Sequence, residues 1–113
     1  MQLEDNLEEK IAQSNAISLQ YFGLDDLAWK KADALNFILS LMNDKIVILG
    51  GDVYKLYQNE LKALYDNWCC EPYDNESKKE YILRSKLAAL EYISSYPADP
   101  NIIFAITYAD AIF

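Results

Sequence analysis

The stretch from Lys45 to Trp68 constrains the fold most, because it combines the densest apolar run of the chain with two of its three glycines. The run Ile46 to Leu49 is rich in β-branched residues and stops at Gly50-Gly51. Such a run favours a strand that is buried on both faces. The glycine pair permits a bulge or a sharp bend, since a residue without Cβ can adopt a positive φ. We therefore expect a sheet to be built around this segment.

The residues after the glycines are compatible with two structures. In the first, Val53 to Tyr57 lead into a turn at Gln58-Asn59-Glu60, and alternation from Leu61 to Asp66 completes a β-hairpin. In the second, the segment is a helix, because its larger apolar residues recur at helical spacing beside good helix formers. The periodicity does not decide between the two. The helical face would consist of Tyr54, Tyr57, Leu61, Leu64 and Trp68.

Two short motifs lie in this stretch, Gly50-Gly51-Asp52-Val53-Tyr54 and Tyr65-Asp66-Asn67-Trp68, and an acidic residue follows at Glu71. With these motifs, the chain from about Leu35 to about Tyr96 resembles the bacterial polymorphic-toxin immunity proteins of the Immunity protein 40 family. That family's motifs usually flank a short glycine turn, whereas this chain has Asn59-Glu60 where Asn-Gly would stand. The resemblance favours the hairpin. It also implies a protein that binds and neutralises a cognate toxin.

Length and composition indicate one globular domain. The chain has 113 residues, enough for one hydrophobic core and too few for two, so we expect a single domain over residues 1–113. Apolar residues make up 52% of it, which is typical of a folded chain rather than a disordered one. No apolar stretch approaches the ~20 residues of a membrane span, and the N-terminus is acidic where a signal peptide would be basic. We expect a cytoplasmic protein.

Two segments in the first half have the apolar periodicity of amphipathic helices. The first predicts a short helix from about Leu3 that ends near Ser14-Asn15. The second predicts a longer helix that is capped by Asp25 or Asp26 and ended by Asn43-Asp44. Its apolar stripe would comprise Leu27, Ala28, Ala32, Leu35, Ile38, Leu39 and Met42.

A third helix is predicted after Ser77, because Ser77 and Glu80 have the spacing of a capping box, in which each side chain satisfies a backbone N–H at the helix start. Pro97 stops this helix. In the connection between the first two helices, Tyr21 and Phe22 are expected to pack inward.

A second β-rich run, Ile102 to Tyr108, follows the stiff turn made by Pro97 and Pro100. We expect it to pair antiparallel with the first strands. The predicted order is therefore α-α-β-β-β-α-β. This is an α+β fold, in which about three helices cover a small, mainly antiparallel sheet, mainly on one face.

Residue types that carry catalysis are scarce. The chain has no histidine, the usual acid–base group near neutral pH. Cys69 and Cys70 are adjacent, so a mutual disulfide would strain the intervening peptide, and they lack the C-x-x-C spacing of a metal site. We expect two reduced thiols, one of them buried. Asp52 and Asp66 could approach each other across the hairpin, but such acids more often bond to turns or face solvent. We expect no enzyme, no cofactor and no metal.

The acidic balance of the chain bears on its partner. Eighteen acidic and ten basic residues give a net charge of −8, which repels nucleic acid and anionic membranes and attracts a basic protein. We therefore expect a basic toxin, a nuclease rather than a peptidase or deaminase. A solvated helix face accounts for the one basic cluster, which consists of Lys78, Lys79, Arg84 and Lys86.

Carboxylates and large aromatics gather in and just after the predicted hairpin, and this combination is suited to binding a basic protein partner. Core packing is the alternative role for Tyr54 and Trp68, and bonding to turns is the alternative for Asp52 and Asp66. The alternative function is a non-catalytic structural or regulatory subunit that uses the same surface for homodimerisation or for a stable intracellular complex. The predicted partner-binding residues are Asp52, Tyr54, Tyr57, Asp66, Trp68, Glu71, Tyr73 and Asp74.

Overall fold

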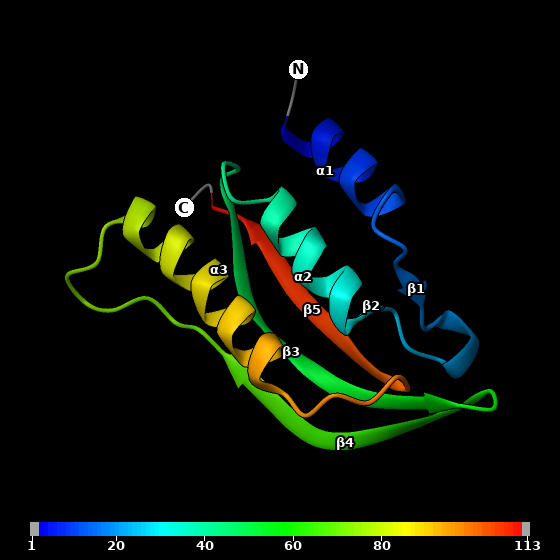
Figure 1. The fold of residues 1–113 in the computed structure, drawn as a ribbon. Coiled ribbons are helices and arrows are strands. Elements are labelled where there is room, and N and C mark those ends of the chain that lie inside the picture. Colours follow the sequence, from blue (N-terminus) through cyan, green and yellow to red (C-terminus); the bar gives the residue numbers. More distant parts are fainter. Residues whose placement is uncertain (1–2, 112–113) are drawn as a thin grey trace.

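The computed structural model describes residues 3–111, which form three α-helices, one 3₁₀ helix and five strands (Figure 1). This confirms the predicted α+β class and element order, to which two short strands, β1 and β2, are added. Within this range no helix is long and apolar enough to cross a membrane. In chain order the elements are α1 (Leu3–Ala12), β1 (Ile17–Ser18), η1 (Gln20–Phe22), β2 (Leu27–Lys30), α2 (Lys31–Ser40), β3 (Ile46–Tyr57), β4 (Glu60–Cys69), α3 (Lys78–Ser95) and β5 (Ile102–Asp110).

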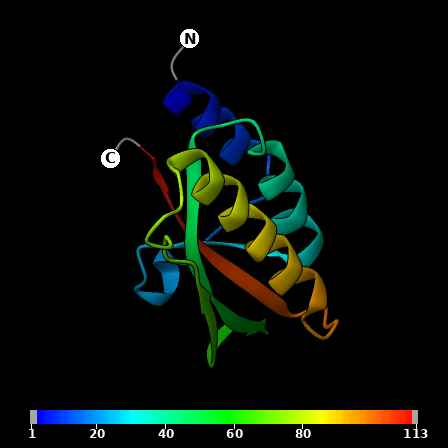
Figure 2. The same ribbon diagram turned by 90° about the vertical axis from the view of Figure 1, so that its left-hand side faces the viewer.

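The five strands belong to one sheet in the order β1-β2-β5-β3-β4, and every neighbouring pair is antiparallel. Helices α2 and α3 lie side by side on one face of this sheet, and the segment around η1 lies on the other (Figure 2). We call the face that points away from α2 and α3 the open face. The structure thus confirms a mainly antiparallel sheet with its helices mainly on one side.

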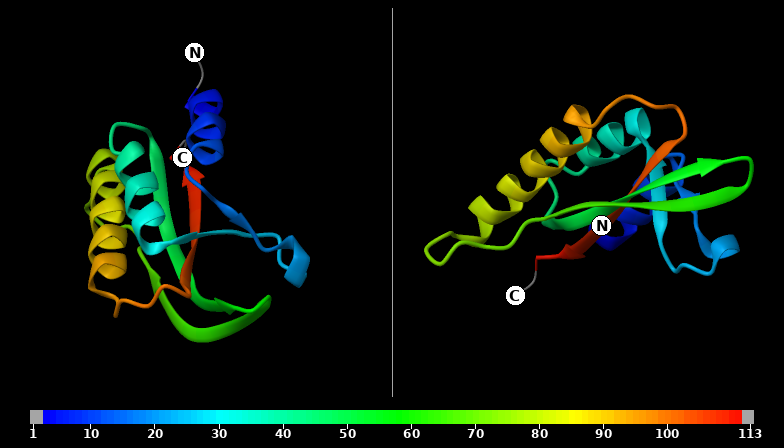
Figure 3. Two further views of the ribbon diagram at one scale, coloured as in Figure 1. Left: turned by 45° about the vertical axis from the view of Figure 1, so that its right-hand side comes forward. Right: turned by 90° about the horizontal axis from the view of Figure 1, so that it is seen from below.

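Strands β3 and β4 form the predicted hairpin, so the helical alternative for residues 54–68 is wrong. Tyr57 pairs with Glu60, which leaves Gln58 and Asn59 as a two-residue loop, one residue shorter than predicted. Their φ angles are 51° and 63°, as a type I′ turn requires, and this turn matches the twist of the strands that it joins. The tip of the hairpin extends beyond the helical layer (Figure 3).

The main core lies between the sheet and helices α2 and α3. The rings of Trp29 and Phe37 stack there with centroids 4.6 Å apart, and Trp29 Nε1–H donates to the Ser14 hydroxyl at 2.8 Å. Large aromatic rings dominate the energetics of such a core because each removes much apolar surface from water. The buried members are Trp29, Ala34, Phe37, Ile38, Leu41, Ile46, Ile48, Val53, Ala89, Ile93, Ile102, Phe104 and Ile106.

The second helix begins later than the sequence predicted. Residues 27–30 form strand β2, of which 28–30 pair with 103–105 in β5, and the helix has Lys30 at its N-cap position. Asp25 and Asp26 precede β2 and cap no helix. Pairing with β5 overrides the local helix propensity of residues 27–30, because backbone groups along the edge of β5 gain hydrogen-bond partners from β2.

Several apolar side chains that were expected to be buried are exposed. Ala32 and Leu39 of the predicted stripe face solvent, because α2 packs through Ala34, Phe37 and Ile38 instead. Tyr21 is 83% exposed, whereas Phe22 is partly buried. Leu49 is also exposed, since it is the extra residue of a β-bulge between Ile48 and Gly50. Of the two features that the glycine pair permitted, a bulge or a sharp bend, the structure has a bulge.

Helices α1 and α3 match their predictions. Helix α1 ends at Ala12, close to the expected boundary. At the start of α3, Glu80 N–H donates to Ser77 Oγ at 3.1 Å and Ser77 N–H donates to Glu80 Oε1 at 2.8 Å. This reciprocal pair is the predicted capping box. Helix α3 ends at Ser95, before Pro97.

Two polar residues of α3 are fully buried, Ser85 and Lys86. Ser85 Oγ accepts the N–H of Ile48 at 3.0 Å, where β3 continues past the end of β4 and has no strand partner on that side. Lys86 Nζ donates to the carbonyl oxygens of Leu41 at 2.5 Å and Asp44 at 2.6 Å, just beyond the C-terminal end of α2, where carbonyl groups lack helical partners. The prediction of a solvated face is therefore wrong for Lys86, and burial lowers the pKa of its ammonium group.

Candidate functional site: the paired motifs and the groove beside them

The two sequence motifs face each other across β3 and β4. Gly50 pairs with Cys69, Gly51 with Trp68, and Asp52 with Asn67. A Cβ on Gly51 would collide with the indole of Trp68 and with the carbonyl oxygen of Ala105. A Cβ on Gly50, whose φ is +153°, would collide with the backbone of β4. The glycines are therefore required because the tryptophan and the neighbouring backbone occupy the space of their missing side chains.

Trp68 is held by packing rather than by hydrogen bonding. Its ring stacks on Tyr92 of α3, with centroids 4.7 Å apart and planes 27° apart, and it packs against the main core. Its Nε1–H is buried and has no hydrogen-bond partner among the residues that the structure describes. A buried donor without a partner carries a desolvation cost, so the shape and area of the indole must outweigh it here.

Asp66 is tied to the same helix. Its Oδ2 accepts the hydroxyl of Tyr96 at 2.5 Å, and this hydrogen bond, together with burial, raises the pKa of Tyr96 to about 12. The bond fixes the Asp66 carboxylate at the junction of β4 and α3, where it remains exposed to solvent.

Strand β4 and helix α3 enclose a groove of about 590 Å³, the β4–α3 groove. The α3 side is a single stripe, because Ala88, Glu91 with Tyr92, and Ser95 with Tyr96 recur about one helical turn apart. Its lining has two carboxylates and no lysine or arginine. The residues that line it are Asp66, Trp68, Cys69, Ala88, Glu91, Tyr92, Ser95, Tyr96 and Pro97.

A second irregularity lies at the start of the tryptophan motif. The register between β3 and β4 shifts between Asp52 and Tyr54, so that residues 64–66 of β4 stand opposite Val53 alone. Within this bulge Tyr65 has φ = 63° and is 89% exposed. A tyrosine in the left-handed region is strained, and such strain is retained mainly where surrounding structure or function demands it. The bulge thus presents an aromatic side chain outward at the free edge of the sheet.

Asp52 and Tyr54 lie on the open face, because the intervening Val53 points into the helical core. Tyr54 packs against the small cluster that covers part of this face, and its pKa is raised by burial and then by the charges of Asp52 and Asp26. Among residues 7–111, the carboxylates of Asp25, Asp26 and Asp52 make no hydrogen bond or ion pair.

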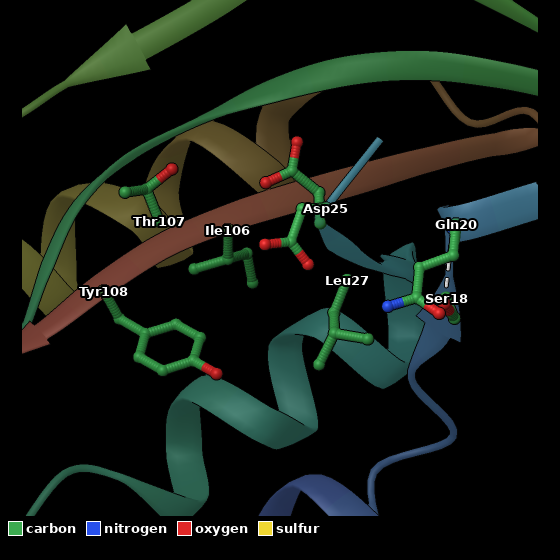
Figure 4. A pocket seen from close by; sticks show the side chains of 8 residues that line it. Ser18, Gln20, Asp25, Leu27, Ile106, Thr107 and Tyr108 are labelled. Atoms are coloured by element: carbon green, nitrogen blue, oxygen red, sulfur yellow. Dashed lines mark hydrogen bonds between the residues drawn. The ribbon is translucent and has the colours of Figure 1, made fainter. Parts of the chain in front are cut away.

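A pocket of about 370 Å³ lies between β5 and the segment that leads into β2 (Figure 4). Pairing between β5 and β2 ends at Ala105, so from Ile106 onward the β2-facing edge of β5 has no strand beside it. Asp25, in the loop before β2, is one of the residues that line this pocket. No group of three histidine, cysteine, aspartate or glutamate side chains in the described part of the chain could hold a metal ion.

The loop from Cys70 to Ser77 is held by Arg84. Its Nε donates to Glu76 Oε2 at 2.6 Å, and its Nη2 donates to Glu76 Oε1 at 2.8 Å and to the Glu71 carbonyl at 2.6 Å. The guanidinium also lies 3.9 Å from the ring centroid of Tyr73. The Arg84 hydrogen bonds hold the pKa of Glu76 at about 2. Arg84 therefore has a structural role, and its assignment to a solvated basic face is wrong.

We compared the sequence of the chain with known protein families. The family model described as Immunity protein 40 matches residues 18–108. The chain belongs to the Immunity protein 40 family. No curated protein and no solved structure matches it.

The Immunity protein 40 match extends further in both directions than the predicted interval from about Leu35 to about Tyr96, and runs from β1 into β5. It therefore includes β2, β3 and β4 in full, Ser18 of β1, and β5 as far as Tyr108. The glycine and tryptophan motifs, from which the resemblance was inferred, form one paired unit at the centre of this region.

In this Immunity protein 40 chain the predicted binding residues are distributed over separate surfaces. Asp66 and Trp68 line the β4–α3 groove, whereas Asp52 and Tyr54 lie on the open face. Tyr57 is 53% exposed beside the hairpin tip. The remaining three, Glu71, Tyr73 and Asp74, are exposed in the loop that Arg84 holds.

Other residues became candidates only in the structure. Tyr65 belongs to a recognised motif, but its outward position depends on a positive φ that the sequence does not reveal. Tyr92 and Tyr96 belong to the apolar periodicity of the third predicted helix, and Glu91 adjoins Tyr92. The spacing of four residues between Tyr92 and Tyr96 is the available signal that these two share a face. Cys69 is exposed and Cys70 is buried, as expected for two reduced thiols, and neither forms a disulfide.

Proposed function

We propose that this protein is an immunity protein that binds a cognate toxin and neutralises it by covering the toxin's active site or a nearby surface. Membership of the Immunity protein 40 family is the observation that carries this proposal. Inhibition of this kind requires a complementary surface and no catalytic group. The lack of histidine is compatible with such a role.

The toxin-facing surface of the proposal is the β3–β4 hairpin with the β4–α3 groove. Its support is the bulge that turns Tyr65 outward, because an exposed tyrosine in a strained conformation is costly for a purely structural strand. Tyrosine is also enriched at protein interfaces, since it buries much area with few rotatable bonds. Of the predicted residues, Asp52, Tyr54 and Tyr57 belong to β3, Asp66 and Trp68 of β4 line the groove, and Glu71, Tyr73 and Asp74 follow β4 in the loop.

We further propose that the toxin is basic, as a nuclease that binds nucleic acid would be. The support is electrostatic: the chain carries a net charge of −8, and Asp25, Asp26 and Asp52 have no cationic partner among the described residues. Carboxylates that are not paired within the chain remain available to lysine and arginine on another protein.

The test requires a candidate toxin domain, and we expect its gene to lie immediately upstream of this one. Co-expression of the chain should restore growth to cells that produce the toxin domain, and the purified proteins should form a stable complex in calorimetry. Variants Asp52→Asn, Asp66→Asn and Glu71→Gln, with thermal unfolding near that of the parent, should weaken the complex. Failure of the parent chain both to protect cells and to bind would refute the proposed function. Formation of homodimers without toxin binding would favour the alternative of a structural subunit.

A further inference from the structure

The β4–α3 groove has a chemical character that goes beyond a general binding surface. Its walls carry two carboxylates, Asp66 on β4 and Glu91 on α3, and no lysine or arginine offsets them among the residues that line it. Both side chains are exposed. Glu91 makes no side-chain hydrogen bond or ion pair within the described structure, and the hydrogen bond from the Tyr96 hydroxyl to Asp66 occupies only Oδ2. The groove therefore offers acceptor oxygens that the chain itself does not use.

Between these carboxylates the groove is lined by aromatic rings. Trp68 and Tyr92 are stacked, and Tyr96 lies next to Tyr92 with ring centroids 6.1 Å apart. The stack and the hydrogen bond from Tyr96 to Asp66 hold the lining in place before any partner arrives. A preorganised site loses less side-chain entropy on binding.

We propose that the β4–α3 groove is the site where one arginine side chain of the toxin anchors the complex. Two carboxylates with free acceptor oxygens beside aromatic side chains match a guanidinium, which is planar and forms bidentate bonds to carboxylate. A lysine ammonium would use the charge of the groove but lacks the planar fork that forms two bonds to one carboxylate. This inference rests on the proposed function, because it names the contact that would hold the toxin.

A second copy of the same chain is a poorer occupant. Each copy carries a net charge of −8, so two copies repel each other as they approach, whereas a basic toxin is attracted. The acidic lining of the groove adds to the attraction for a basic toxin over a second acidic copy.

The decisive variant is Glu91→Gln, because Glu91 is exposed and its carboxylate has no partner within the described residues, so that folding should be unaffected. Asp66→Asn is the second variant, and it retains an oxygen that can accept the Tyr96 hydroxyl. Glu9→Gln, which neutralises an exposed acid on α1, is the matched control. Calorimetry with the neighbouring toxin domain should show that each groove variant raises Kd by at least about tenfold, while the control does not.

Double-mutant cycles between Glu91→Gln and single arginine-to-alanine variants of the toxin domain test whether an arginine of the toxin binds in the groove. One arginine should lose most of its contribution to affinity when Glu91→Gln is already present. In addition, the exposed thiol of Cys69 lines the groove, so its reaction with Ellman's reagent should slow in the complex.

The outcomes separate the two proposals. If the parent chain binds the toxin domain but both groove variants bind equally well, or no arginine couples to Glu91, the groove assignment is wrong and the proposed function stands. Unchanged Cys69 reactivity in the complex would also reject the assignment. If the parent chain does not bind the toxin domain at all, both proposals fall together.

Discussion

At the residue scale, the contact between Gly51 and Trp68 explains why the two motifs occur together. The indole lies where a side chain at position 51 would be, and it also stacks on Tyr92. Packed interiors tolerate added atoms poorly, because neighbouring side chains are already in contact. The glycine and the tryptophan are thus a matched pair, and each is required by the size of the other.

Gly51→Ala should therefore destabilise the protein by about 1–3 kcal/mol, the usual cost of overpacking a core. Urea unfolding would measure this change. In a Trp68→Phe background, where the ring is smaller, the cost of Gly51→Ala should be less. Gly23→Ala is the control, because a Cβ there meets no atom within 4 Å and adds only the strain of φ = +81°. Stability equal to the parent in Gly51→Ala would contradict the collision.

At the element scale, the hairpin and the loop that follows β4 are held by quite different means. The hairpin depends on its turn, in which Gln58 and Asn59 both take positive φ without a glycine. The loop depends on one arginine of α3, which binds Glu76 and the Glu71 carbonyl and lies over the ring of Tyr73. The two elements should therefore respond to different perturbations.

Asn59→Gly should stabilise the hairpin by on the order of 1 kcal/mol, because a non-glycine residue in the left-handed region costs roughly 1–2 kcal/mol. The measurement is urea unfolding. Lys62→Gly, which places glycine within β4 at an exposed position, is the control and should destabilise the protein. A destabilised Asn59→Gly variant would show that Asn59 contributes more than its backbone conformation.

Acid should weaken the attachment of the loop to α3. The Arg84 hydrogen bonds lower the pKa of Glu76 from 4.5 to about 2, so the stabilisation is complete above pH 4.5 and is lost as pH falls toward 2. Unfolding measured from pH 2 to pH 6 should therefore show a smaller loss of stability in Glu76→Gln than in the parent. Glu71→Gln, whose side chain is exposed and which binds Arg84 only through its carbonyl, should keep the parental profile. Identical profiles for Glu76→Gln and the parent would refute this role.

At the scale of the whole molecule, some acidic side chains form ion pairs within the chain and others do not. The described ion pairs join Lys10 to Asp44, Lys55 to Asp99 and Arg84 to Glu76, and each holds parts of the chain together. Acids without an ion pair lie elsewhere: Asp25, Asp26 and Asp52 at the open face, Asp66 and Glu91 in the β4–α3 groove, and Glu8 and Glu9 on α1. Part of the excess negative charge therefore lies in the groove proposed for binding.

Association with a basic toxin domain should slow steeply as salt rises, because ions screen the attraction that guides the two proteins together. Stopped-flow measurements between low and physiological ionic strength would record the change. The dissociation rate, which reports contacts within the formed complex, should vary less. An association rate that does not depend on salt would remove electrostatic steering from the proposed function.

Much of the fold followed from the sequence because its signals are local. The β-branched run before Gly50 and the capping box at Ser77 each depend on neighbours a few residues away. The hairpin was favoured over a helix by the family resemblance, because the local pattern allowed both. The glycine pair permitted a bulge or a sharp bend, and the structure has a bulge beside it. The candidate site was found only in part, because Asp66 and Trp68 lie in the motifs while Glu91, Tyr92 and Tyr96 lie far along the chain.

Tertiary structure decided what local patterns leave open. Residues 27–30 became a strand because β5 offered backbone partners, which overruled a helical pattern. Lys86 and Arg84 were assigned from the sequence to a solvated helix face. In the structure, Lys86 is buried against the end of α2 and Arg84 holds a loop. The face on which each carboxylate of the hairpin lies depends on strand register, and the bulge at Tyr65 changes that register. The sequence by itself determines most of the elements, whereas the strand at residues 27–30 and the assignment of side chains to surfaces depend on contacts between elements that only folding establishes.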